Sequence, residues 1–159
     1  MTIVTLMDDL AEFLRPVVAD YSTQQASGKR EIQVFAGYAP IRRSAEELPS
    51  FIYTLVTSAQ DNDDGSFSTA NVEIGFSIYD NSEHEPWRSL FNLLEHIRQH
   101  LLQHRLVANQ YRLVLPLKIN IPDEQPYPQW QGSITATYTI GQPTEEVFDF
   151  EYEDEKITV

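Results

Sequence analysis

Near the start of the chain, apolar residues recur at steps of three and four, which is the spacing of a helix with one buried face. The stripe runs from Leu6 to Val18, and Thr5 is placed to cap its first turn. Pro16 lies too deep for the first turn of a helix, where a missing N–H costs little. We therefore expect this helix to kink or end near Arg15 and to restart beyond the proline.

A second stretch with the same spacing predicts a helix over residues 83–104. Ser82 and Glu85 have the separation of a capping box, and Pro86 falls in the predicted first turn. When residues are placed at 100° steps, one side of this helix is apolar: Trp87, Leu90, Phe91, Leu94, Ile97 and Leu101. The opposite side, which includes His96, is expected to face solvent.

Five stretches with alternating or continuous apolar residues indicate strands: residues 31–35, 51–56, 69–79, 111–121 and 133–140. The second and third flank a turn rich in Asp and Asn and are expected to form an antiparallel hairpin. Residues 44–49 are expected to add a helical turn. The order α-β-β-β-α-β-β predicts an α+β fold, with a four- to five-stranded mixed or antiparallel sheet and two main helices packed on one face.

The length of 159 residues fits one domain, which we place at residues 1–142, followed by an acidic tail at residues 143–159. In the tail, acidic residues alternate with Val147, Phe148, Phe150 and Tyr152. This pattern is too apolar for an inert tail and too charged for a core.

Charge and composition narrow the possible partners. The formal net charge of −13 argues against binding to nucleic-acid phosphates, which needs clustered Lys and Arg. Cysteine is absent, the first ten residues lack the basic start of a signal peptide, and no apolar run approaches the ~20 residues of a membrane helix. We expect a cytosolic protein without disulfides and without membrane contact.

No glycine-rich phosphate loop, nucleophile elbow or zinc-protease motif is present in the sequence. We therefore expect a protein that is not an enzyme and needs no cofactor. His96, His100 and His104 recur every four residues, which suggests either a metal-binding edge or a solvated or interface edge of the helix. Three such ligands converge poorly on one ion, so the edge is the favoured interpretation.

A calcium loop is the other metal hypothesis, at residues 61–65. Asp61, Asp63 and Asp64 supply oxygen atoms, but the glycine comes one place early and Val72 occupies the position that should hold a bidentate Glu. The pattern favours a solvated hairpin loop.

The turn between the last two predicted strands is a candidate contact surface. Pro122, Pro126 and Pro128 restrict the residues that precede them, so Tyr127 and Trp130 can be held on a rigid projecting loop. The alternative is that Trp130 packs over the edge of the sheet.

Two residues of the second helix are further candidates for a subunit or partner interface. Arg98 lies between Leu94 and Leu101, close to the apolar side. It either extends along that side with its charge in water or pairs with an acid on the sheet or on a neighbouring subunit. Trp87 is the other candidate.

Four stretches together, by their order and spacing, resemble the small tail-terminator (tail-completion) proteins of long-tailed bacteriophages and prophages: PSFIYTLV at 49–56, IYD at 78–80, LEHIR at 94–98 and PYPQWQG at 126–132. The resemblance implies a structural subunit that forms a hexameric ring with itself, caps the tail tube and stops its polymerisation. Its implied partners are the major tail-tube protein and a head-tail connector protein. It also implies a location in the host bacterial cytoplasm during assembly, and at the head-proximal end of the virion tail afterwards. The acidic tail and Pro16 depart from the minimal family pattern, so the placement of the chain ends in a ring stays open.

The resemblance gives the acidity a possible purpose. Acidic residues that line a DNA channel would repel phosphates and keep the duplex mobile. We expect the loop of Asp61, Asp63 and Asp64, or the acidic tail, to face the lumen or a neighbouring ring. Two alternatives stay open: another head-tail connector or minor tail protein, and a small accessory module that binds a divalent metal or another ligand.

Overall fold

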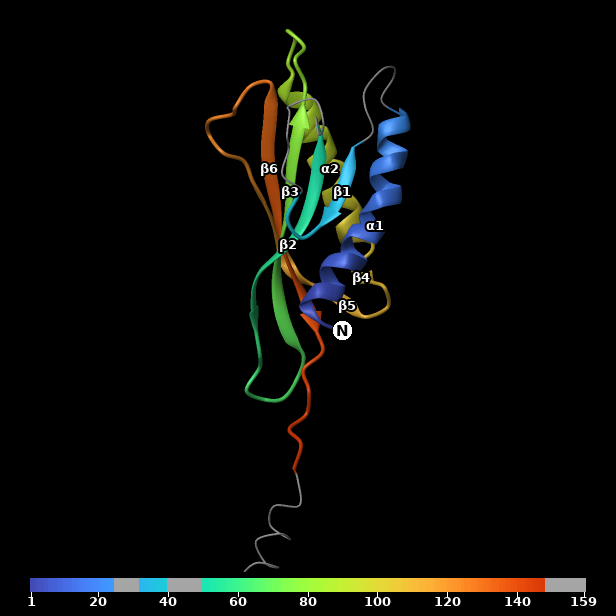
Figure 1. Cartoon of the computed structure of the whole chain (residues 1–159), viewed down its shortest axis with the longest axis vertical. Coiled ribbons are helices and arrows are strands. Elements are labelled where there is room, and N and C mark those ends of the chain that lie inside the picture. Colours follow the sequence, from blue (N-terminus) through green and yellow to red (C-terminus); the bar gives the residue numbers. More distant parts are fainter. Residues whose placement is uncertain (25–31, 40–49, 148–159) are drawn as a thin grey trace, which may run out of the picture.

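Figure 1 shows the computed structural model, which describes residues 1–24, 32–39 and 50–147. The elements follow the order α1 (Ile3–Gln24), β1 (Gln33–Ala36), β2 (Phe51–Gln60), β3 (Ser68–Tyr79), α2 (Trp87–Gln103), β4 (Leu106–Val107), β5 (Tyr111–Asn120) and β6 (Gln129–Ile140). The α+β class and the two main helices are confirmed. The helical turn expected at residues 44–49 and the tail beyond residue 147 lie outside the described residues.

The strands form one mixed, curled six-stranded sheet in the order β1-β2-β3-β6-β5-β4. β1 is parallel to β2 and the other neighbours are antiparallel, so the expected hairpin of β2 and β3 is confirmed. The sequence analysis missed β4. This strand has two residues and pairs Leu106 with Arg112 and Val107 with Tyr111, so it is too short to produce an apolar pattern.

Both helices lie on the same face of the sheet (Figure 1). The core fills the space between the two helices and this face. Val72, Ile74 and Phe76 of β3 point into this core, as their alternation predicted. On the far face, the ring of Tyr53 lies across Gly75, its partner in the β2–β3 register. A Cβ at Gly75 would stand 2.0 Å from the Tyr53 ring, so any other residue at this position would have to displace that ring.

One expectation for α1 was wrong. Thr2, not Thr5, is the N-cap, since its hydroxyl accepts the Thr5 N–H at 3.1 Å while the Thr5 hydroxyl accepts the Thr2 N–H at 2.8 Å. At Pro16 we expected the helix to kink or to end, and it does not end, because α1 continues through the proline. Leu14 and Val18, on either side of the proline, are buried in the core. Because packing holds both halves, the helix survives the loss of one backbone hydrogen bond.

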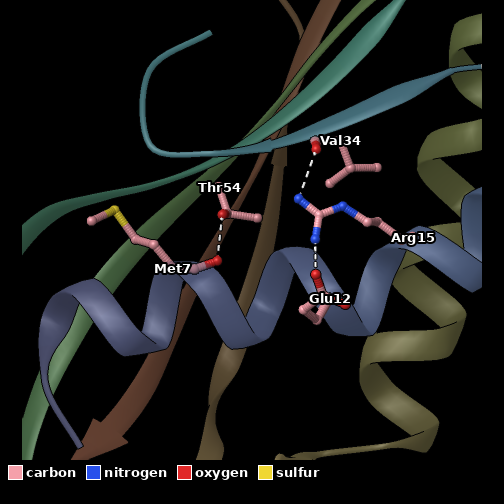
Figure 2. Close-up of polar contacts among 5 residues, drawn as sticks. All are labelled: Met7, Glu12, Arg15, Val34 and Thr54. Atoms are coloured by element: carbon pink, nitrogen blue, oxygen red, sulfur yellow. Dashed lines mark hydrogen bonds and ion pairs between the residues drawn. The ribbon is translucent and has the colours of Figure 1, made fainter.

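Polar contacts also fix α1 on the sheet (Figure 2). The hydroxyl of Thr54 on β2, fully buried, donates to the Met7 carbonyl at 2.9 Å. Arg15 pairs with Glu12 and donates through Nη2 to the Val34 carbonyl of β1 at 3.3 Å. These contacts join the helix to the first two strands.

The predicted start of α2 was wrong by about one turn. Glu85 has a positive φ of 47°, and Pro86 is the N-cap without a side-chain capping bond, so Ser82 and Glu85 form no capping box. The apolar face is also rotated from the prediction. Leu93 is buried, whereas Trp87 and Phe91 are 40% and 44% exposed. Two aromatic rings assigned to the core therefore lie on the surface.

Candidate functional site

The central pair β3–β6 places two clusters of candidate residues at opposite ends of the sheet. Tyr79 pairs with Gln129 at one end, and Ser68 pairs with Ile140 at the other. Figure 1 shows these ends at the top and the bottom of the molecule. We name them the aromatic end, residues 79–91 and 121–130, and the acid end, residues 61–68 and 140–147.

At the aromatic end, the proline turn is tied to the segment that follows β3. The Asp80 N–H donates to the Pro128 carbonyl at 3.0 Å, and the Trp130 indole N–H donates to the Asp80 carbonyl at 3.1 Å. The Tyr127 hydroxyl donates to the Asn81 carbonyl at 3.0 Å. Two turns far apart in sequence are thus joined into one surface.

The two rings of this turn have different surroundings. They meet edge to face, with centroids 6.1 Å apart. Trp130 is half-buried and packs against the core, which is the alternative that the sequence analysis left open. Tyr127 is 57% exposed, so its ring projects from the surface while its hydroxyl is held.

The side chain of Gln125 holds the turn from inside. Its amide nitrogen donates to the Gln131 carbonyl at 2.9 Å, and its amide oxygen accepts the Gln131 N–H at 2.6 Å. These paired bonds imitate the bonds between two strands. The loop is therefore fixed by side-chain contacts in addition to its prolines.

The start of α2 adds a second aromatic pair to this end. Trp87 and Phe91 meet edge to face at 5.5 Å, and the Arg88 guanidinium stands 4.9 Å from the Trp87 ring centroid. Ser89 donates to the Asp80 carboxylate at 2.5 Å. Asp80 therefore contacts both the proline turn and α2, and it holds their relative position.

Arg98 does not pair with an acid on the sheet, and its pairing with a neighbouring subunit stays a prediction. It binds Glu95 of its own helix through two bonds, Nε to Oε2 at 2.8 Å and Nη2 to Oε1 at 2.6 Å. Hydrogen bonds from Arg98 and then from Gln99 lower the pKa of Glu95 to about 2. Because both side chains are partly exposed, this pair adds little stability, and it leaves the guanidinium accessible at the surface.

The acid end is a turn held by amide contacts. The Gln142 side chain accepts the Asn62 N–H at 2.8 Å and donates to the Asn62 carbonyl at 2.9 Å. Ser68 donates to Asp61 at 2.6 Å. The loop between β2 and β3 is thereby fastened to the residues that follow β6.

The three aspartates expected in the loop are not equivalent. Asp61 binds Ser68, and Asp64 accepts the Ser66 N–H at 2.9 Å. Hydrogen bonding from the Ser66 side chain, and then from its backbone, lowers the Asp64 pKa. Asp63 is exposed at the tip of the turn, and Glu145 and Glu146 follow on exposed backbone. Two aspartates thus shape the turn, and the charge of Asp63 faces solvent.

The histidine row lies in the seam between α1 and α2, and the expectation that His96 faces open solvent was wrong. The rings of His96 and Tyr21 are 5.1 Å apart, and His104 meets Phe13 edge to face at 6.3 Å. Burial and then the neighbouring His96 and His104 lower the pKa of His100, while Asp20 acts in the opposite direction. Two rings of the row therefore pack against α1 side chains within the same molecule, a position that the spacing did not predict.

Asp80, Gln125 and Gln142 are structural residues of the two ends that the sequence analysis did not single out. The side chains of Gln125 and Gln142 bind backbone groups 6 and 80 positions away, and the Asp80 carbonyl accepts the indole N–H of Trp130, 50 positions away. Nothing in the local pattern marks such contacts. Phe91 was noticed, but the helical wheel assigned it to the core.

No protein-family model matches the chain, and no curated protein has a sequence detectably similar to it. Among residues 1–24, 32–39 and 50–147, no group of three or more His, Asp or Glu side chains could hold a metal ion. Neither of the helices in this part of the chain has the length and apolar character needed to span a membrane.

Proposed function

We propose that this protein is a structural subunit of a long-tailed bacteriophage or prophage, one that caps the tail tube, stops its polymerisation and takes part in head-tail joining. Its proposed partners are further copies of itself, in a ring of about six subunits, the major tail-tube protein and a head-tail connector protein. Assembly would take place in the bacterial host cytoplasm. The ring size and the partners rest on the resemblance of the sequence to tail terminators.

The separation of the two ends is the observation that best supports this proposal. A protein that joins two structures needs two different surfaces, and a closed ring needs two different patches on each subunit. The aromatic end offers a fixed, partly apolar surface with Tyr127, Trp87 and Phe91 exposed. The acid end offers carboxylates on a hydrogen-bonded turn, which suits a channel through which DNA must slide.

The first test is the solution mass of the protein by light scattering over a range of concentrations, with negative-stain images of the largest species. A closed ring of about six subunits would support the proposal. A monomer at every concentration would contradict ring formation in solution and leave only assembly on the tube tip.

The capping step is tested with tail-tube protein from the same phage. Tubes polymerised with the wild-type protein should have a limited length, whereas Tyr127→Ala should allow longer tubes. Tyr127→Phe keeps the exposed ring and is the matched control. Tubes of equal length with and without the protein would contradict the capping role.

A further inference from the structure

Among the described residues no strand pairs with the outer edge of β1, and a groove lies beside it. Gln33 and Gly37 donate their N–H groups to β2, so the intervening Val34 directs its N–H and carbonyl away from the sheet. In the sheet that the described residues form, β1 is the last strand on this side. Such an edge can accept another strand.

α1 forms the other wall of the groove. The groove has a volume of about 540 Å³, and its helix side consists of Arg15, Pro16 and Ala19. Its strand side consists of residues 32–35. Arg15 is the charged residue among them, and its guanidinium covers the outward Val34 carbonyl through a long bond of 3.3 Å (Figure 2).

One segment of this chain matches such a groove in its pattern. After Val147, apolar Phe148, Phe150 and Tyr152 alternate with acidic residues, which is the period of a strand with one apolar side and one acidic side. Apolar side chains suit the Pro16 and Ala19 wall. An incoming strand would replace Arg15, which is already paired with Glu12, at the Val34 carbonyl, and its acidic side chains would lie on the face away from α1, in solvent.

The groove of the same molecule is out of reach. Val34 pairs with Ile52, which in turn pairs with Phe76, so the groove lies at the level of Phe76 on β3. The tail leaves β6 after Ile140, which pairs with Ser68 of β3. These levels are eight residues of β3 apart, roughly 26 Å at about 3.3 Å per residue. Residues 141–147 lead away from the sheet past the β2–β3 turn (Figure 1), and the three further residues to Phe150 span only about 10 Å.

We propose that residues 147–153 of one copy bind as an added strand at the β1 edge of a second copy, in the groove between β1 and α1. The inference rests on the self-association in the proposed function and specifies its contact. Each subunit then gives a tail and receives one, which is a head-to-tail contact of the kind that closes rings.

Light scattering on full-length variants tests the exchange. The combined change Phe148→Ser, Phe150→Ser and Tyr152→Ser should shift the oligomer to the 18.3 kDa monomer. Ile157→Ser with Val159→Ser, beyond the alternating segment, should leave the oligomer intact. Ala19→Trp should fill the groove and also give monomer, whereas Gln103→Trp on the exposed end of α2 should not.

Crosslinking shows which surfaces meet. The chain has no cysteine, so Gln33→Cys and Glu151→Cys chains carry one thiol each, both on the face away from α1. Mixed and oxidised, they should form a covalent dimer containing both chains, whereas Gln103→Cys with Glu151→Cys should not. An oligomer that persists in the tail variant, without the Gln33–Glu151 crosslink, would overturn the exchange but not self-association. A wild-type monomer at every concentration would overturn both.

Discussion

The aromatic end and the acid end are held together by different interactions. Each fastens a turn of the sheet to a neighbouring segment through a side chain that binds backbone groups: Trp130 to Asp80 at one end, and Gln142 to Asn62 at the other. Trp130 adds the burial of a large ring, whereas Gln142 offers only hydrogen bonds, each worth about 1 kcal/mol net. The aromatic end should therefore be the more rigid of the two.

This difference fits the two roles that we propose. A surface that is already ordered loses little conformational entropy when it binds, which favours the aromatic end as a protein contact. A hydrated turn with exposed charge presents little apolar area, so its main influence on DNA is electrostatic repulsion. The four predictions below test the comparison, from the largest effect to the smallest.

Removing the Trp130 ring should have the largest effect on stability. Trp130→Ala should lower the free energy of unfolding by about 3 kcal/mol, because a partly buried ring and its bond to Asp80 are lost together. Urea unfolding monitored by circular dichroism measures the change. Trp130→Phe, which keeps most of the apolar area, should lose only about 1 kcal/mol. Equal losses for the two variants would show that the hydrogen bond, and not packing, holds the aromatic end.

Gln142→Ala should have an intermediate effect, a loss of about 1–2 kcal/mol, since its side chain bonds both backbone groups of Asn62. Hydrogen exchange should show faster opening of residues 61–67, with the aromatic end unchanged. Gln110→Ala, an exposed glutamine in the β4–β5 turn, is the matched control. If residues 61–67 exchanged no faster in Gln142→Ala than in the control, the proposed role of this bridge would be contradicted.

Acid should loosen the acid end selectively. Hydrogen bonds from Ser66 lower the pKa of Asp64 below its ordinary value of 3.8. A lowered folded pKa means that this contribution to stability is complete above pH 4 and is lost as the pH falls through the folded value. The protection of residues 61–67 against hydrogen exchange, relative to the unfolded chain at the same pH, should therefore fall below about pH 4. Asp64→Asn keeps an acceptor oxygen without the carboxylate, so a loss of protection of equal size in this variant would contradict the assignment.

The elements that were predicted correctly are those whose signal is local. The alternation of Val72, Ile74 and Phe76 identified β3 because each side chain meets the same core from the same face. The Asp-rich turn before it identified the hairpin partner. These patterns depend on neighbours in the sequence, and tertiary contacts did not override them.

The errors lie where contacts distant in sequence decide the structure. Pro16 breaks an isolated helix, but burial of Leu14 and Val18 keeps α1 continuous. The helical wheel placed Trp87 in the core, but the positive φ at Glu85 and the late start of α2 leave that ring exposed. The candidate surface was partly predictable, since the prolines indicated a rigid turn. The backbone groups that bind Tyr127 and Trp130 come from the segment after β3, which no local pattern connects to that turn.

Asp63 provides the smallest expected effect on stability and the clearest test of function at the acid end. Asp63 is exposed, as Asp61 and Asp64 are, but unlike theirs its side chain makes no hydrogen bond within the described residues, so Asp63→Asn should change the free energy of unfolding by less than about 0.5 kcal/mol. Combined with Glu145→Gln and Glu146→Gln, it should slow DNA ejection from phage that carry the variant, because phosphates would meet less repulsion. Asp123→Asn, in the exposed turn at the aromatic end, removes an acid far from the proposed channel and should leave the ejection rate unchanged. Equal ejection rates for wild type and the triple variant would place these acids outside the channel, and the acid end would then have to act in contacts between proteins.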